Sequence, residues 1–172
     1  MPLEPFEGRM PRIHETAFVH PSATLIGDVE IGPESSVWPG AVLRGDLGPI
    51  RVGAKTSIQD NAVIHATPRG GTYIGSSCVI GHLAFIEEAT VEDACLVGVG
   101  AKILNGARMR VGSAAAAGTV VLGSMEVPSG CRAQGVPAKI IEGARPTEEE
   151  IRRDADSYVQ TAKRMAASLG LA

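Results

Sequence analysis

The chain has 172 residues, of which 44% are hydrophobic and 20% are charged, and its formal net charge is -3. This length suits one globular domain, and the absence of a basic run argues against nucleic acid or an anionic membrane as the partner. The amino terminus lacks a signal-peptide pattern, and no stretch is apolar enough to span a membrane. We therefore expect a cytoplasmic protein that binds a small molecule or another protein.

The composition also argues against a conventional packed core. Aromatic residues make up only 3% of the chain, whereas there are 21 glycines and 11 prolines. The three cysteines are odd in number and form no CxxC motif, so a disulfide framework or a cysteine metal cage is not expected.

An aliphatic residue recurs every six positions over most of the chain. The fifth position of each hexad is usually small, and the aliphatic series is Ile13, Val19, Leu25, Ile31, Val37, Leu43, Val52, Ile58, Ile64, Ile74, Ile80, Ile86, Val91, Val97, Ile103, Met109, Ala115, Val121, Val127 and Ala133. Neither a helix nor an alternating strand has this period, whereas a hexapeptide-repeat parallel β-helix does. We therefore predict an all-β solenoid over residues 13–142, in which three hexads make one triangular coil, after an N-terminal segment of residues 1–12.

The six-residue count is interrupted three times. Leu43 to Val52 has three extra residues, Ile64 to Ile74 has four extra, and Ile86 to Val91 is one short. Insertions in a solenoid are expected as loops at its corners, where such folds tend to place function.

A helix is expected after the repeat ends, over residues 147–170. Thr147 and Glu150 have the spacing of a capping box. The apolar residues that follow recur at helical spacing, namely Ile151, Ala155, Tyr158, Val159, Ala162, Met165 and Ala166. We expect this helix to pack along one side of the prism.

The coil arithmetic places the polar residues in two columns. Arg44, His65 and Glu87 are second positions of hexads on one side in successive coils, so they should stack. Asp60 and His82 occupy matching positions on a different side, with Gln59 beside them. One chain therefore brings His65 and Glu87 together but keeps His82 apart.

A cyclic homotrimer would bring the two columns together at each interface between subunits. Two imidazoles and a carboxylate around an open position can hold catalytic zinc, and the same set also suits iron(II). We accordingly expect a divalent metal at His65, His82 and Glu87, with zinc favoured and iron, cobalt or nickel as alternatives.

Several motifs resemble the γ-class carbonic anhydrase family over roughly residues 10 to 142. These are Arg44-Gly45-Asp46, Ile58-Gln59-Asp60-Asn61, Val63-Ile64-His65, Ile80-Gly81-His82 and Gly135-Val136-Pro137-Ala138-Lys139. The resemblance implies a left-handed parallel β-helix that forms a trimer, with a metal held by three histidines at each interface. Glu87 stands where the family has its third histidine.

The resemblance also implies roles for the residues around the metal. Arg44 and Asp46 match an ion pair between subunits, and Gln59 and Asp60 match a catalytic pair in which Gln59 orients the metal-bound water. The implied reaction is attack of metal-bound hydroxide on CO2, or on a related small electrophile.

Two alternatives remain open at this point. A hexapeptide-repeat acyltransferase would use a histidine as general base and bind acyl-CoA between prisms. A noncatalytic trimeric scaffold descended from the enzyme would keep the fold without the chemistry. Metal analysis separates the metalloenzyme from both, and thioester consumption identifies the acyltransferase.

Overall fold

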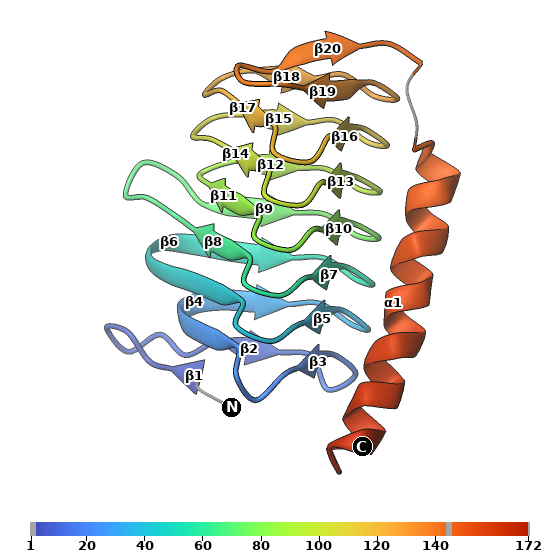
Figure 1. Ribbon diagram of the computed structural model, residues 1–172. Coiled ribbons are helices and arrows are strands. Elements are labelled where there is room, and N and C mark those ends of the chain that lie inside the picture. The colour runs from blue at the N-terminus through green and yellow to red at the C-terminus, as the bar shows by residue number, and fades with distance from the viewer. Residues whose placement is uncertain (1–2, 144–145, 172) are drawn as a thin grey trace.

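The computed structural model describes residues 3–143 and 146–171 and forms a parallel β-solenoid with one helix alongside it (Figure 1). Two long strands, β4 (Thr24–Ile31) and β6 (Val42–Val52), each run across the first and second sides of the prism. This architecture confirms the predicted β-helix with a C-terminal helix.

Short parallel strands stack one coil apart on each side. The first side also contains β1 (Leu3–Glu4), β8 (Val63–His65), β11 (Phe85–Glu87), β14 (Lys102–Ile103) and β17 (Val120–Val121). The second side also contains β2 (Arg12–Ile13), β9 (Thr72–Ile74), β12 (Thr90–Val91), β15 (Arg108–Met109) and β18 (Glu126–Val127). The third side contains β3 (Phe18–Val19), β5 (Ser36–Val37), β7 (Ser57–Ile58), β10 (Val79–Ile80), β13 (Leu96–Val97), β16 (Ala114–Ala115), β19 (Arg132–Gln134) and β20 (Lys139–Ile141), the last being antiparallel to β19.

The repeat residues form the core. Every member of the aliphatic series is buried except Ile13, which is partly buried against the same cluster. Equivalent members pair in register between coils, as Ile64 does with Ile86. A narrow prism of stacked Ile, Val and Ala side chains leaves no room for rings, which accounts for the scarcity of aromatic residues.

The helix α1 (Glu148–Ser168) covers the third side of the solenoid (Figure 1). Its capping box between Thr147 and Glu150 is present. Tyr158 packs against Trp38, with ring centroids 6.2 Å apart, and Trp38 packs against Phe18 at 5.6 Å. These three rings therefore join the helix to the solenoid and lie outside the core of the prism.

Two details differ from expectation. The amino-terminal segment adds a strand, because Leu3 pairs in register with Leu25. The insertion between Leu43 and Val52 is not a loop, because β6 continues through it with a register shift against β4. The second insertion does form a loop, which a reciprocal pair of backbone hydrogen bonds between Thr67 and Gly70 closes.

The described part of the chain contains no helix that is both long and apolar enough to cross a bilayer.

Candidate functional site

The first predicted column is present on the first side of the solenoid. Arg44 of β6 pairs in register with His65 of β8, and His65 pairs with Glu87 of β11. Each follows a buried repeat residue in its strand, and strand alternation directs it outward. The position of each residue in the hexad repeat is therefore sufficient to predict that these three side chains stack.

His65 lies between two carboxylates. Its Nδ1 is 2.6 Å from Oε1 of Glu87, and its Nε2 is 3.0 Å from Oδ1 of Asp46. The imidazole is only 11% exposed, so this arrangement is shielded from water.

Asp46 is held by further contacts in the same chain. Arg44 forms an ion pair with Oδ2 of Asp46, and the backbone N–H of Leu47 donates to Oδ1 at 2.9 Å. Burial alone would raise the pKa of Asp46, but hydrogen bonds from Arg44 and His65 outweigh it and lower that pKa below its ordinary value. The Arg44–Asp46 pair thus forms within one chain, and any contact that it makes with another subunit stays a prediction.

The second predicted column is present on the third side. Nδ1 of His82 is 2.9 Å from Oδ2 of Asp60, one coil away. The backbone N–H of His82 donates to Oε1 of Gln59 at 3.1 Å, and Gln59 is buried. His82 itself is 48% exposed, so its ring is available to a second molecule.

A groove runs beside His82, between the third side and the first half of α1. Its volume is about 430 Å³, and it is lined by small and aliphatic residues of β13 and β16 together with Gln59, His82 and Tyr158. Tyr158 also contacts Gln59. Burial, together with the nearby Asp154, raises the pKa of Tyr158 above its ordinary value. The helix therefore helps to position the predicted Gln59.

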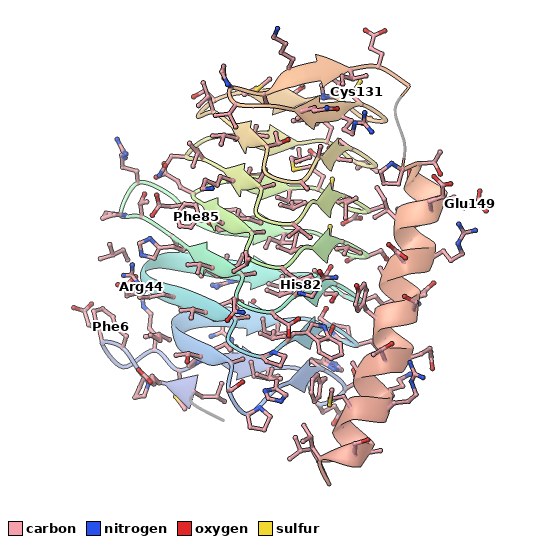
Figure 2. All side chains as sticks on the ribbon, viewed as in Figure 1. Phe6, Arg44, His82, Phe85, Cys131 and Glu149 are labelled. Carbon is pink, nitrogen blue, oxygen red and sulfur yellow. The ribbon has the colours of Figure 1, made fainter. Side chains whose placement is uncertain are left out.

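The two columns do not meet within one chain. Figure 2 shows Arg44 at the edge of the first side and His82 well away from it. Among the described residues, no three His, Cys, Asp or Glu side chains are grouped so that they could hold a metal ion. A metal site would need both half-sites, one from each of two chains.

The side chains of the half-sites nevertheless have the right chemistry for a divalent ion. Imidazole nitrogen and carboxylate oxygen are ordinary ligands of zinc and of iron(II). Asp60 beside Nδ1 of His82, and Glu87 beside Nδ1 of His65, are the kind of carboxylate partners that orient ligating histidines. The donor set therefore fits such an ion.

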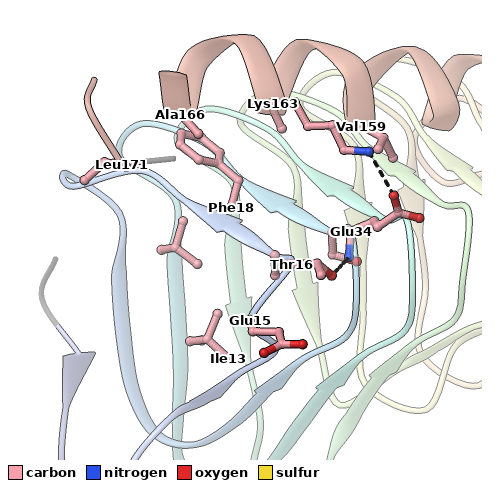
Figure 3. Close-up of a pocket in the computed structure, with 13 residues that line it drawn as sticks. Ile13, Glu15, Thr16, Phe18, Glu34, Val159, Lys163, Ala166 and Leu171 are labelled. Atoms are coloured by element: carbon pink, nitrogen blue, oxygen red, sulfur yellow. Dashed lines mark hydrogen bonds and ion pairs between the residues drawn. The ribbon is translucent and has the colours of Figure 1, made fainter. Parts of the chain in front are cut away.

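A separate hollow of about 320 Å³ lies between the first coils and the carboxyl-terminal half of α1 (Figure 3). It is lined by Phe18 and Val159, and Lys163 pairs with Glu34 across it at 3.1 Å. None of the predicted site residues lines it.

Comparison with known proteins agrees with the hexapeptide repeat. The model of the bacterial transferase hexapeptide (six repeats) matches residues 10–45. A carbonic anhydrase of Geobacillus kaustophilus is 35% identical over 150 residues, which cover 87% of this chain and 81% of that protein. The chain belongs to the γ-class carbonic anhydrase family.

Other members of this family are longer. The γ-carbonic anhydrase 2 of Arabidopsis thaliana mitochondria is 40% identical over 164 residues, or 90% of this chain, but this stretch is only 58% of that protein. The chain thus spans little more than half the length of the Arabidopsis relatives that it matches.

Solved structures with the same fold carry transferase names. A hexapeptide transferase family protein of Anaplasma phagocytophilum has a TM-score of 0.88 at 39% identity, covering 94% of this chain and 96% of that one. A putative acetyltransferase of Bacillus cereus has a TM-score of 0.92 at 29% identity, covering 96% of both chains. The γ-carbonic anhydrase family and the hexapeptide acyltransferases share this fold, so the fold alone does not decide the reaction.

Sequence reasoning missed two contacts at the site. It did not place Asp46 beside Nε2 of His65, because Asp46 lies in the insertion that breaks the six-residue count. It also assigned Tyr158 only to the packing face of the helix, whereas Tyr158 contacts Gln59.

Proposed function

We propose that this chain is a γ-carbonic-anhydrase-type metalloenzyme whose site forms between two copies of the chain in a homotrimer. The observation that carries the proposal is the pair of half-sites, each with a histidine held by a carboxylate, in a member of this family. The expected substrate is CO2 or bicarbonate, or a related small electrophile. A cytoplasmic location is part of this proposal.

Exposed aliphatic side chains beside both half-sites support the trimer. Leu83 follows His82 and is 62% exposed, and Val99, one coil further along, is 49% exposed. Leu47 follows Asp46 and is also exposed. Burying these side chains against another copy would be favourable, and a closed ring of three copies would use each surface once.

The proposed metal would be held by His65 and a carboxylate of one chain and by His82 of a neighbouring copy. The sequence names Glu87 as that carboxylate, and zinc is the favoured ion. A divalent ion in such a site supplies water of lowered pKa for attack on an electrophile. Because a carboxylate ligand leaves less positive charge than a third imidazole, we expect the activity to require a higher pH than in a three-histidine site.

The remaining residues of the proposed site orient His82 and the attacking water. Asp60 accepts the proton on Nδ1 of His82, which leaves the Nε2 lone pair free to face the shared site. Gln59 fixes the His82 backbone through its Oε1, and we propose that its amide also helps to orient the attacking water. Gln59 and Asp60 are in this sense the proposed catalytic pair.

The groove beside His82 favours a second candidate, an acyltransferase. About 430 Å³ is far more space than CO2 needs, and the small side chains of β16 leave room for an extended acyl group. In that reaction His82, polarised by Asp60, would remove a proton from an acceptor hydroxyl or amine.

Metal content and two assays decide among these functions. The protein would be purified anaerobically, analysed for zinc, iron, cobalt and nickel, and assayed for CO2 hydration by stopped flow and for acetyl-CoA consumption with amine acceptors. Bound metal with hydration activity is expected. Thioester consumption without metal would establish the acyltransferase, and a trimer without metal or either activity would be a scaffold.

A further inference from the structure

We infer that Asp46, and not Glu87, supplies the carboxylate ligand of the proposed metal, and that Glu87 is a positioning residue for His65. This inference rests on the proposed function, because it assigns roles within the same site. Asp46 thus replaces Glu87, which its position in the hexad repeat had indicated as the ligand.

The spacing of the two carboxylates around His65 favours Asp46 as the ligand. Two ligands that are each roughly 2.0–2.2 Å from one ion, at angles between a right angle and the tetrahedral angle, lie roughly 2.8–3.5 Å apart. Oδ1 of Asp46 is 3.0 Å from Nε2 of His65, which suits two ligands of one ion. Oε1 of Glu87 is 2.6 Å from Nδ1, which is a short hydrogen bond and is too close for two ligands of one ion.

The contacts of the two ring nitrogens of His65 also favour Asp46. A ring that donates its Nδ1 proton to Glu87 presents a lone pair at Nε2 when the ring is neutral. Nε2 faces Oδ1 of Asp46 at hydrogen-bond distance, and in the metal-free chain the ring can donate a proton there. A divalent ion bound to Nε2 would take the place of that proton, with Oδ1 of Asp46 already beside it. Glu87 then orients the ring of His65 through Nδ1, as carboxylates commonly do for metal-binding histidines.

Asp46 is also held in place by two further contacts. Its Oδ2 is paired with Arg44, and its Oδ1 accepts the backbone N–H of Leu47, so the carboxylate is held in place with Oδ1 toward His65. Glu87 has no such second anchor among the contacts described, and its side chain is more exposed than that of Asp46. The structure therefore holds Asp46 more firmly as a ligand than Glu87.

The insertion in β6 has a role in this arrangement. Asp46 lies between Leu43 and Val52, where three residues exceed the repeat, and the register with β4 shifts just beyond Gly45. The extra backbone carries the Asp46 side chain next to Nε2 of His65, where no hexad position falls.

The test is zinc binding by the metal-free protein, measured by titration calorimetry with elemental analysis. The variants are Asp46→Asn and Glu87→Gln, and Glu126→Gln on the second side serves as a matched control. We expect Asp46→Asn to lose stoichiometric zinc, Glu87→Gln to keep it with about 10- to 100-fold weaker affinity, and the control to bind like the wild type. Light scattering would verify that each variant remains trimeric.

Two outcomes would overturn the assignment. Loss of zinc in Glu87→Gln with normal binding in Asp46→Asn would make Glu87 the ligand. Equal loss in both variants would show that Glu87 is needed as much as Asp46 and is not only a positioning residue. Should Asp46→Asn fail to fold, the crystal structure of the zinc-loaded wild type settles the matter by whether Asp46 or Glu87 contacts the ion. If the wild-type protein binds no zinc, iron, cobalt or nickel, the proposed metal centre itself fails, which is a different result.

Discussion

Nδ1 of His82 lies 2.9 Å from the carboxylate of Asp60, one coil away on the third side of the solenoid. This contact joins neighbouring coils and engages Nδ1, so Nε2 is the ring nitrogen left to bind another group. A half-exposed histidine with one fixed tautomer is suited to serve a second copy of the chain.

Removal of this ring should abolish metal binding without dissociating the trimer. In His82→Ala one of the two proposed imidazole ligands is lost, whereas the neighbouring Leu83 and Val99 remain for association. Elemental analysis and sedimentation velocity would measure the two properties on one sample. A monomeric His82→Ala protein would show that the ring acts in assembly.

The exposed aliphatic residue beside His82 gives a test of the trimer itself. Leu83→Glu places a charge where we propose that apolar side chains are buried, so the trimer should dissociate at micromolar concentration. Val136→Glu is the control, because Val136 is 71% exposed near the carboxyl-terminal end of the solenoid, away from both half-sites. If both variants sediment like the wild type, the proposed interface is wrong.

Two glycines with similar backbone angles should respond differently to alanine. Gly27 and Gly130 have φ values of 72° and 67°, so a Cβ is strained at either position, at about 1 kcal/mol. A Cβ on Gly27 would lie 2.5 Å from the carbonyl oxygen of Gly45, whereas none of the atoms around Gly130 comes within 4 Å. Urea unfolding should show a clearly larger loss of stability for Gly27→Ala, and similar losses would contradict the steric argument.

The ion pair between Asp28 and Arg51 should make stability depend on pH. The hydrogen bond from Arg51, at 2.8 Å, holds the pKa of Asp28 below its ordinary value. A lowered pKa in the folded state stabilises the fold above the unfolded-state pKa of about 4, and this contribution disappears as the pH falls through the folded-state pKa.

Asp28→Asn should therefore be less stable than the wild type by about 1 kcal/mol at neutral pH. The difference should shrink as the pH falls below about 4, because wild-type Asp28 then becomes protonated. Urea unfolding across this range would measure it, with Asp156→Asn as a control on the exposed surface of α1. A difference that does not change with pH would rule out the ion pair as its cause.

The cysteines should differ in reactivity. Burial raises the pKa of Cys95 to about 11 and raises that of Cys78 further, whereas the Cys131 side chain is partly exposed. Ellman's reagent should modify only Cys131 in the native protein and all three thiols in denaturant. Rapid native modification of Cys78 or Cys95 would mean that their coils open readily.

The sequence alone predicted the solenoid, the capped helix, and the stacking of His65 with Glu87 and of His82 with Asp60. The reason is that the aliphatic residue of each hexad must point inward, so a position in the hexad determines both the side of the prism and the neighbour one coil away.

Only the tertiary structure decided which atoms meet around His65. Asp46 approaches Nε2 because β6 runs on through an insertion, and Tyr158 reaches Gln59 because α1 lies along the third side. Neither the inserted backbone nor the path of the helix follows the six-residue period, so counting residues could not place these two side chains.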